Sequence, residues 1–285
     1  MSGQTFHNQS LTEFLQRHQP VTVLTGAGCS TASGIPDYRD QNGDWKQRLP
    51  IQYQEFIASH AARQRYWQRS MLGWSRFSAA RPNRIHRGLV ALEQAGIINA
   101  VITQNVDGLH TRAGQSEVVE LHGSLATVRC LQCDARQSRK QFQIWLTEKN
   151  EAVFQTVEAE GVTLQADGDV DYEPASDAPF QYPDCPECHG ILKPDVVFFG
   201  EVVPVGRVNR AFELINESGA LLVLGSSLMV FSGFRFSRHA HENDFPQAIV
   251  NRGVTRADNL NVTKIDADCG VVLSHLCDQL LGLTL

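Results

Sequence analysis

Residues 24–40 read LTGAGCSTASGIPDYRD, and this stretch begins inside the apolar run of residues 21–25. A short apolar run followed by a Gly-Ala-Gly turn is typical of a buried parallel strand that leads into a nucleotide-binding loop. The usual dinucleotide fingerprint has glycine or alanine three residues after its second glycine, whereas here Thr31 stands three residues after Gly28. Glycines let a phosphate approach the backbone, and Ser30 and Thr31 can donate to it at a helix start. The stretch therefore predicts an unusual phosphate-binding loop, with a simple tight turn as the alternative.

Similar apolar runs recur along the chain, and helical patterns separate them. The runs that we expect to form buried strands are residues 21–25, 100–103, 221–224, 248–250 and 262–265. Helical patterns cover residues 11–18, about 61–78, 85–95, 207–218 and 270–281. This alternation predicts an α/β fold with a doubly wound, Rossmann-like parallel sheet. Because ligands lie across the carboxyl ends of such strands, the loops after the first four runs should converge on one crevice.

Two segments interrupt this alternation and define the expected domains. Residues 40–78 are polar and helical, and residues 128–194 hold four paired cysteines and an acidic insert, residues 148–180. We expect a Rossmann-like domain of residues 1–125 and 193–285, with a helical insert at about 40–80. A smaller zinc-binding domain should span residues 126–192, inserted between strands of the large domain.

Four of the seven cysteines form two C-x-x-C pairs, Cys130/Cys133 and Cys185/Cys188. Two thiolate pairs supply the four soft ligands of a tetrahedral structural zinc site, and a closed shell of thiolates leaves no position for catalysis. The 51 residues between the pairs exceed a compact zinc ribbon, so part of that span must loop out. Two independent reduced pairs are the alternative. The odd cysteine count favours a reducing compartment over a disulfide framework.

The composition is that of an ordinary globular protein, with 42% hydrophobic and 20% charged residues in a chain of 285. A net charge of -6 argues against general binding to nucleic acid or anionic membranes and is compatible with a cationic partner such as a lysine-rich tail. No apolar run is long enough to span a bilayer, and residues 1–10 lack a signal or transit pattern. We expect a cytoplasmic monomer without nucleic-acid or membrane partners.

Three further polar motifs follow predicted strands or precede the cysteine segment. Residues 103–110 read TQNVDGLH and place two amides and a carboxylate close together, at Gln104, Asn105 and Asp107. Residues 120–123 read ELHG, and a histidine such as His122 has an unperturbed pKa near ~6.5, which suits a general base at neutral pH. Residues 251–253 read NRG, which fits a ribose and adenine contact. An Asx-rich turn, a structural histidine and a common turn are the respective alternatives.

The order of these motifs along the chain is highly specific. GAGCSTASGIPDYR, TQNVDGLH, ELHG, the two C-x-x-C pairs, KPDVVFFGE, GSSL and NRG together resemble the sirtuins, the NAD-dependent protein lysine deacylases. The resemblance extends from Val21 to about Cys269. The sequences GSSLMVFSGFRF, ADGDV and RYWQRSMLGW look most like class II of the family, with Phe231-Ser232 where many deacetylase sirtuins have a proline.

The resemblance implies the cofactors NAD and zinc, with NAD held in a strained pose rather than one suited to hydride transfer. The residues near the pyrophosphate would be Gly26, Ala27, Gly28 and Ser30, and those near the nicotinamide Asp37, Tyr38 and Arg39. Nicotinamide and ribose would be bound by Gln104, Asn105 and Asp107, with Asn105 helping to hold a water near the reacting carbon. The remaining cofactor contacts would be Gly225, Ser226, Ser227, Asn251, Arg252, Gly253 and Cys269.

The resemblance also implies the reaction. Nicotinamide would leave the ribose, the acyl oxygen of the substrate would attack the exposed ribose carbon, and His122 would take a proton from a ribose hydroxyl. The products would be free lysine, nicotinamide and O-acyl-ADP-ribose. His122 and Asn105 would be the catalytic residues, and a closing loop at residues 36–47 would exclude water.

The implied substrate is an acyl-lysine protein or peptide, which sirtuins clamp as an extended strand between two segments. Here the segments would be residues 196–201 and 225–233. Within the first, Val197 and Phe198 would wall the acyl-lysine tunnel, and the substrate contacts would continue to Gly200 and Glu201. A plain buried strand is the alternative for this segment.

Tyr66 and Arg69 lie three residues apart on a predicted helix and hence on one face of it. This spacing resembles the pair that binds the acid end of succinyl groups in class III sirtuins. If the pair has that role, it would favour carboxylated acyl chains through a charge-assisted contact. A solvated helix face is the alternative.

Three other functions compete with protein deacylation. A mono-ADP-ribosyltransferase would use the same activated ribose and share every NAD residue. A non-catalytic NAD-binding module is disfavoured because His122 and Asn105 are both present. A hydride-transfer dehydrogenase is disfavoured by the altered glycine fingerprint and by the lack of a clear acidic ribose ligand about 20 residues beyond it.

Overall fold

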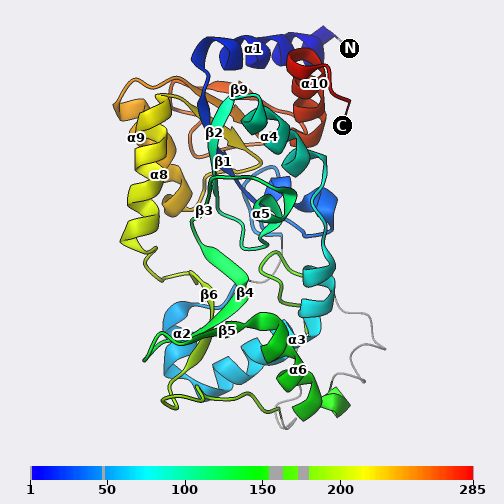
Figure 1. Ribbon diagram of the computed structural model, residues 1–285, viewed down its shortest axis with the longest axis vertical. Helices are drawn as coiled ribbons and strands as arrows, with labels where there is room; N and C mark the ends of the chain where they lie inside the picture. The colour runs from blue at the N-terminus through cyan, green and yellow to red at the C-terminus, as the bar shows by residue number, and fades with distance from the viewer. Residues whose placement is uncertain (1, 47–48, 154–162, 173–179, 285) are drawn as a thin grey trace.

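The computed structural model describes residues 2–46, 49–153, 163–172 and 180–284. Its larger part is a six-stranded sheet in the order β3-β2-β1-β7-β8-β9, which lies in the upper half of Figure 1. The strands are β1 (Val21–Thr25), β2 (Ile98–Thr103), β3 (Val118–Glu120), β7 (Leu221–Leu224), β8 (Gln247–Val250) and β9 (Thr263–Ile265). Every neighbouring pair is parallel, so the predicted doubly wound sheet is confirmed. The strand order reverses between β1 and β7, which is where such folds bind ligands.

Helices bury both faces of this sheet, because successive side chains of a strand point to opposite sides. Val23 of β1 packs in one core, between the sheet and three helices, and Leu24 packs in the other core. The first face is covered by α1 (Ser2–His18), α4 (Arg84–Gln94) and α10 (Cys269–Leu281), and the second by α8 (Val205–Ser218) and α9 (Phe231–Glu242). Burial on both faces explains why these strands read as continuous apolar runs.

The start of α4 is tied directly to the loop that follows β1. Asn83 caps this helix, since its side-chain oxygen accepts a hydrogen bond from Ile85 N at 2.8 Å. The amide of the same side chain donates to Cys29 O at 2.8 Å and to Ser33 Oγ at 2.9 Å. One capping residue therefore fixes the position of the loop as well as the first turn of the helix.

A second region, here called the small module, lies in the lower half of Figure 1. It contains a three-stranded antiparallel sheet in the order β5-β4-β6, together with helices from two separate segments of the chain. Its elements are β4 (Gly123–Cys130), β5 (Arg136–Ser138), β6 (Leu192–Val196), α2 (Tyr53–Ala58), α3 (His60–Ala79) and α6 (Arg139–Lys149). Trp67 and Met71 of α3 share a core with Val128 of β4 and Phe142 of α6. The helical insert thus packs with the cysteine segment, while the predicted domain boundaries stay a prediction.

Several elements were not predicted from the sequence. They are β3, α6, α9, the antiparallel strands, and a short helix after β2, α5 (Leu109–Ala113), whereas α2 lies within the segment predicted to be helical. β3 has only three residues, Val118–Glu120, and is recognised as a strand only through its pairing with β2. The buried stripe of α9 consists of Gly233, Phe236, Ser237 and Ala240, so it has helical spacing but only one large apolar side chain.

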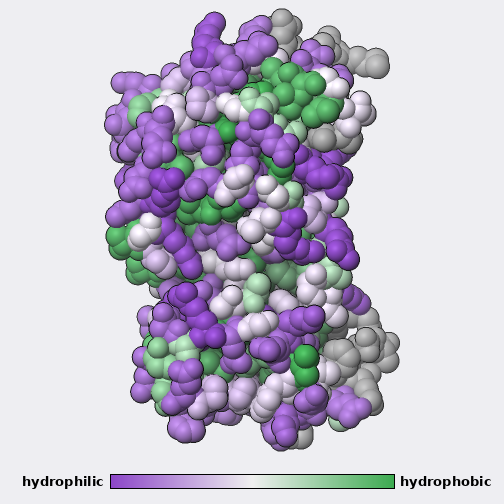
Figure 2. All heavy atoms as spheres, viewed as in Figure 1, coloured by the Kyte–Doolittle hydropathy of each residue, from purple (hydrophilic) through white to green (hydrophobic). Residues whose placement is uncertain are grey.

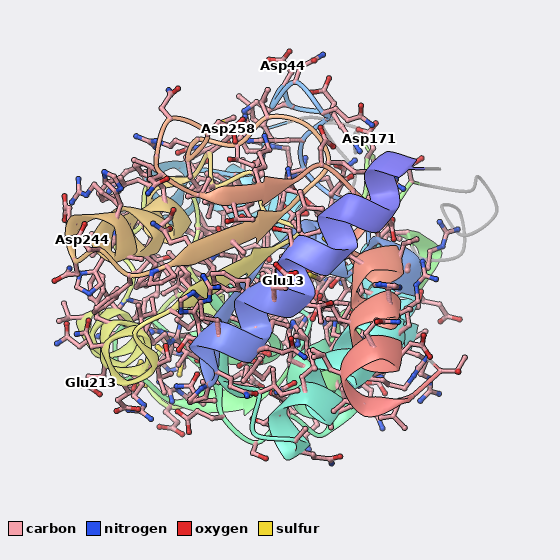
Figure 3. All side chains as sticks on the ribbon, turned by 90° about the horizontal axis from the view of Figure 1, so that it is seen from above. Glu13, Asp44, Asp171, Glu213, Asp244 and Asp258 are labelled. Carbon is pink, nitrogen blue, oxygen red and sulfur yellow. The ribbon has the colours of Figure 1, made fainter. Side chains whose placement is uncertain are left out.

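The ends of the chain lie together on the sheet side of the molecule. Seen from above, α1 crosses the sheet next to α10, and the two helices contact each other (Figure 3). The face shown in Figure 2 is mostly hydrophilic, and apolar atoms gather near α10, where Val271 and Leu283 are exposed. Among the residues that the structure describes, no helix is both long and apolar enough to cross a membrane.

Candidate active site

The loops after β1 and β7 pack directly against each other at the carboxyl edge of the sheet. Gly28 N donates to Gly225 O at 2.9 Å, and a Cβ atom on Gly26 would lie 2.7 Å from the same oxygen. A Cβ on Gly28 would lie 2.9 Å from Gly225 Cα, and Gly225 itself has φ +61°. Glycine is therefore required at these positions by the close approach of two loops. The sequence predicted phosphate approach or a tight turn at these glycines, and the contact between the two loops is visible only in the fold.

Polar side chains from the β1 and β2 loops form one hydrogen-bonded network. Ser30 Oγ donates to Asp107 Oδ2 at 2.6 Å, and Asn105 Nδ2 donates to Ser30 Oγ and to Gly26 O, each at 3.0 Å. Burial raises the pKa of Asp107, and the hydrogen bonds from Ser30 and from Leu109 N oppose that rise. The network brings together three predicted cofactor residues that stand up to 77 positions apart in sequence.

Gln104 extends this network to the β7 loop. Its side-chain Nε2 donates to Ser226 Oγ at 2.7 Å, and its backbone N donates to Thr25 O at 3.0 Å. Ser226 Oγ also accepts a hydrogen bond from Leu228 N at 3.2 Å. The loops after β1, β2 and β7 are thus joined by side chains that the sequence analysis had assigned to the cofactor.

His122 lies beside this network, at the start of the small module. Its Nδ1 is 2.8 Å from Gln104 O, and its Nε2 is 2.8 Å from Ser232 Oγ. A carbonyl oxygen only accepts, so Nδ1 carries the proton, and in the neutral ring Nε2 accepts from the Ser232 hydroxyl. Ser232 lies in the predicted peptide-clamping segment 225–233, but its contact with the base was not predicted, because no local pattern links residues 122 and 232.

The environment of His122 keeps its ring neutral. Burial is the main cause that lowers the pKa of His122 to about 4, and the cations Arg207 and Arg235 lower it further. The hydrogen bond to Gln104 O acts in the opposite direction. At pH 7 the imidazole therefore presents an unprotonated nitrogen, which is the form that can accept a proton.

The loop after β8 reaches the segment that follows the glycine turn. Gly253 has φ +80°, and a Cβ there would overlap Gln41 O. Val254 N donates to the same oxygen at 2.9 Å, while Gly253 N donates to Asp266 Oδ1 at 3.1 Å. The NRG motif therefore requires its glycine for a contact between two loops, and its role toward NAD stays a prediction.

Three other predicted cofactor residues of the β8 region have partners within the protein. Asn251 Nδ2 donates to Arg252 O at 2.9 Å, and the Arg252 guanidinium lies 3.2 Å from Asp268. Cys269 is buried, and its thiol donates to Val250 O at 3.3 Å. The neighbouring Cys269 thiol is the main cause that raises the pKa of the Cys29 thiol, and burial raises it further.

Asp37 and Arg39 of the predicted closing loop contact other residues of the same loop. Asp37 pairs with Lys46 at 2.6 Å. The Arg39 guanidinium stacks 4.1 Å from the centre of the Trp45 ring and donates to Gly43 O at 2.6 Å. Residues 36–46 of this loop are described, and Gln47 lies outside the described residues.

The two C-x-x-C pairs converge at the far end of β4. All four sulfur atoms lie within 4.8 Å of one another, with Cys130 Sγ 3.5 Å from Cys188 Sγ and Cys133 Sγ 3.7 Å from Cys185 Sγ. Tetrahedral zinc with bonds of about 2.3 Å separates its sulfur ligands by about 3.8 Å, so the cluster fits this ion. Cys130 ends β4 and His122 directly precedes it, a separation of about 26 Å for an extended strand, so the zinc role is structural.

The segment after β6 links His122 to the interior of the small module. Val197 N donates to His122 O at 2.8 Å, and the Phe198 ring lies 5.2 Å from the rings of Phe56 and Tyr66. Glu201 turns back into the protein, because its Oε2 accepts from Phe198 N at 2.9 Å and from Lys193 Nζ at 3.0 Å.

Gly200 completes the turn of this segment with φ +79°. Left-handed backbone of this kind favours glycine, since a side chain there would be strained. Neighbouring Phe199 O accepts from Tyr53 N at 2.8 Å, which joins the turn to α2. The roles of Gly200 and Glu201 toward a substrate stay predictions.

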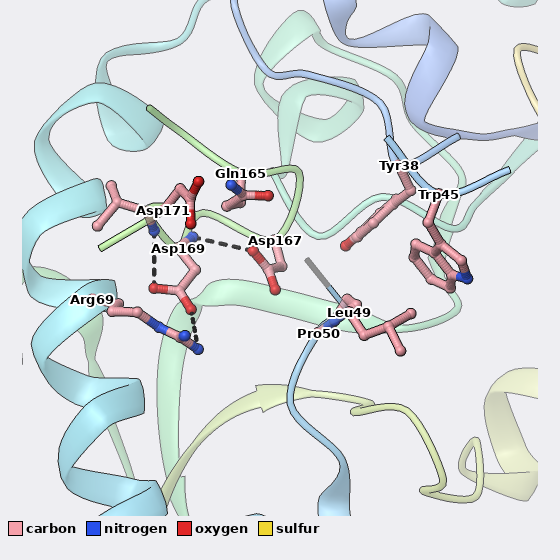
Figure 4. Close-up of a pocket in the computed structure, with 10 residues that line it drawn as sticks. Tyr38, Trp45, Leu49, Pro50, Arg69, Gln165, Asp167, Asp169 and Asp171 are labelled. Atoms are coloured by element: carbon pink, nitrogen blue, oxygen red, sulfur yellow. Dashed lines mark hydrogen bonds and ion pairs between the residues drawn. The ribbon is translucent and has the colours of Figure 1, made fainter. Parts of the chain in front are cut away.

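Tyr66 and Arg69 lie on one face of α3, as their spacing predicted, but neither is a free surface group. Tyr66 is buried, and Arg69 forms an ion pair with Asp169 at 2.9 Å (Figure 4). Only 11% of the Arg69 side chain and 8% of the Asp169 side chain are exposed, so a solvated helix face is excluded. Asp169 belongs to the part of the acidic insert that the structure describes, residues 163–172.

Comparisons with known proteins agree with the geometry of this site. The family described as the Sir2 family matches residues 26–232. An "NAD-dependent protein deacetylase" of Xanthomonas axonopodis pv. citri (strain 306) is 48% identical over 271 residues, which cover 94% of this chain and 90% of that protein. "NAD-dependent protein deacetylase 2" of Bradyrhizobium diazoefficiens is 48% identical over 280 residues, covering 97% of this chain and 100% of that protein.

Solved structures of Sir2 proteins share the fold. One, described as "Structural Basis for the Mechanism and Regulation of Sir2 Enzymes", has a TM-score of 0.73 and 30% identity over 96% of this chain and 97% of its own. Another, described as "Sir2-p53 peptide-NAD+", has a TM-score of 0.68 and 29% identity over 93% of this chain and 95% of its own.

Proposed function

The chain belongs to the Sir2 family and is an NAD-dependent protein lysine deacylase, and we propose that His122 is its general base. The observation that carries this assignment is the pair of contacts around the imidazole, Nδ1 to Gln104 O and Nε2 to Ser232 Oγ. They support a neutral ring whose Nε2 lone pair is directed at a hydroxyl, which is what proton removal from a ribose hydroxyl requires. A substrate hydroxyl would replace Ser232 at the same lone pair.

The side chains at the carboxyl edge of the sheet fit NAD. Its bound form supplies an activated ribose carbon once nicotinamide departs. We assign Gln104, Asn105 and Asp107 to the ribose and nicotinamide, because they lie together, half-buried, where three loops meet. The assignment of the pyrophosphate to Ser30 and the Gly-Ala-Gly turn is supported by their position at the reversal of strand order.

The substrates are proteins or peptides that carry acyl-lysine. We propose that the peptide lies between residues 196–201 and 225–233 as an added strand. Both segments flank His122, since Val197 N contacts its backbone oxygen at 2.8 Å and Ser232 contacts its ring at 2.8 Å. This arrangement would bring a lysine side chain past Phe198 toward the base.

The cofactors differ in what they do. NAD takes part in the reaction, whereas zinc holds four thiolates together at the end of β4 opposite to His122. We propose that the protein works in the cytoplasm as a monomer without nucleic-acid partners. Its unpaired cysteines and its net charge of -6 support the compartment and the lack of nucleic-acid binding, and light scattering would test the monomer.

The experiment that tests this function is turnover of NAD against a panel of acyl-lysine peptides, followed by mass spectrometry. The panel contains acetyl, long-chain, lipoyl, succinyl and glutaryl forms. We expect one O-acyl-ADP-ribose for each lysine released. Transfer of ADP-ribose to a protein without loss of any acyl group would instead support a mono-ADP-ribosyltransferase.

A further inference from the structure

A pocket lies between the predicted closing loop, α3 and the insert (Figure 4). Tyr38 and Trp45 line it from the loop, Arg69 lines it from α3, and Gln165, Asp167 and Asp169 line it from the insert. In Figure 4 the Tyr38 hydroxyl and the Asp167 carboxylate point toward the same space. Residues assigned to the nicotinamide end and residues of the insert therefore share one cavity.

A continuous set of contacts connects this pocket to His122. Val197 N donates to His122 O, and the ring of the next residue, Phe198, packs against Tyr66 at 5.2 Å. Tyr66 is one helical turn before Arg69 on α3. The neighbouring carboxylates Asp169 and Asp167 raise the pKa of Tyr66, although burial is the larger cause. An acyl chain that extended beyond Phe198 in the direction of these contacts would approach the pocket.

The charges of the pocket are unbalanced. Its described lining residues comprise one arginine and three aspartates, Asp167, Asp169 and Asp171. Arg69 is already paired with Asp169 at 2.9 Å, and Asp169 is held in place because its Oδ1 accepts from Val170 N at 2.9 Å. Burial raises the pKa of both Asp167 and Asp169, whereas the Arg69 charge lowers it. A carboxylate that entered would have to separate a buried ion pair and then face the remaining anionic groups.

From these contacts, and on the basis of the function proposed above, we propose that Asp169 determines acyl selectivity. By occupying Arg69 it prevents this cation from binding an acidic chain end. Removing a buried group from its ion-pair partner is unfavourable, and like charges placed together add repulsion. The enzyme should therefore prefer acetyl-lysine and other neutral acyl groups over succinyl-lysine and glutaryl-lysine. Release of Arg69 should reverse this preference.

The test is Asp169→Asn, which keeps the size of the side chain and an oxygen for Val170 N. We expect the ratio of kcat/KM for succinyl-lysine to kcat/KM for acetyl-lysine to rise by about tenfold, as expected for one new charge-assisted hydrogen bond. Asp171→Asn is the matched control, because Asp171 is an exposed residue lining the same pocket, and this change leaves the Arg69–Asp169 pair intact. The control should change the ratio less than about twofold.

Two further variants make the test decisive. In the single variant, Asp167 could pair with Arg69 in place of Asp169. The double variant Asp167→Asn/Asp169→Asn removes this possibility, and it should raise the succinyl-to-acetyl ratio of kcat/KM at least as much as the single change. Asp169→Asn/Arg69→Met should abolish the gain, because the gain depends on the guanidinium. Thermal melting of each variant with NAD establishes that it is folded.

Retained acetyl turnover without any rise in the ratio, in both the single and the double aspartate variants, would overturn the inference. A gain that survives Arg69→Met would overturn it as well, and so would a native enzyme that uses both peptides equally. If the native enzyme turned over no acyl-lysine peptide, the proposed function would fail instead. The affinities for fluorescent succinyl-lysine and acetyl-lysine peptides would then test the selectivity. Asp169→Asn should raise the affinity for the succinyl peptide relative to the acetyl peptide by about the same factor.

Discussion

The carboxyl edge of the sheet and the small module organise their polar groups in different ways. At the sheet edge, polar side chains that are buried or half-buried form hydrogen bonds with one another, as in the contacts of Ser30, Asn105 and Asp107. One buried arginine of the small module instead packs against an aromatic ring and donates to a backbone oxygen. Arg139 is fully buried, with its guanidinium 4.6 Å from the centre of the Trp74 ring and 3.2 Å from Ser70 O.

This difference follows from what supports each region. The sheet has apolar cores on both faces, which position its loops independently of any ion. The small module has a single core and a three-stranded sheet, and four cysteines come together at its edge. We therefore expect the sheet edge to bind NAD without zinc, and the small module to depend on the metal.

The largest effect should come from a change where the two regions meet. His122→Ala removes the proposed base, so kcat should fall about 10²- to 10⁴-fold, which corresponds to about 3–5 kcal/mol. NAD binding, measured by calorimetry, should persist, because the side-chain network of the β1 and β2 loops does not include the His122 ring. Loss of NAD binding in this variant would contradict the assigned role.

Cys130→Ala should have the next largest effect, and it should destabilise the small module while leaving the sheet edge intact. Loss of one thiolate unseats zinc, and we expect it to destabilise the small module by more than about 3 kcal/mol. Metal content and thermal melting would measure the effect, and NAD binding would report on the sheet edge. A variant with native stability and full activity would refute the structural role of the metal.

A smaller effect is expected from Gly28→Ala at the sheet edge. Its Cβ would lie 2.9 Å from Gly225 Cα, so the β1 and β7 loops would have to separate. We expect a loss of about 2 kcal/mol in unfolding free energy and weaker NAD binding, with zinc content unchanged. Gly34→Ala is a useful control, because its Cβ would meet no atom within 4 Å and only the φ of +85° opposes the change. Equal losses of NAD affinity in both variants would argue against the loop contact.

The smallest predicted effect is a pH dependence that arises beside the sheet edge. Burial lowers the pKa of His110 to about 3, and the neighbouring His86 lowers it further. Because the unfolded ring binds a proton near pH 6.5 and the folded ring does not, stability is fully present above about pH 6.5 and is lost as pH falls toward 3. Between pH 6.5 and 5.5 this residue should account for about 1 kcal/mol of lost unfolding free energy.

Urea unfolding of His110→Gln at these two pH values tests the prediction. The variant should be less stable than the native protein at both, since it loses a buried ring. Its stability should nevertheless fall less with acid, by about 1 kcal/mol. An equal fall in both proteins would exclude His110 as the source.

Much of the sheet could be predicted from the sequence, because residues buried on both faces leave continuous apolar runs. The strands at 21–25 and 221–224 were predicted with the bounds that the structure has. Short or amphipathic elements such as β3 and α9 carry no comparable pattern. The convergence of the loops at one edge of the sheet could be predicted from the topology of parallel sheets. The clustering of the four thiols could be predicted from the spacing of the two C-x-x-C pairs.

The partners of the polar side chains were decided by tertiary structure alone. Arg69 has the spacing of a ligand-binding residue, yet Asp169, one hundred positions later, occupies it. Likewise, His122 meets Ser232 across 110 positions. Periodicity and spacing describe what one segment can do, so the sequence by itself determined the fold, the metal ligands and the candidate base. Which charges remain free depends on long-range neighbours in space, and only the folded chain brings those together.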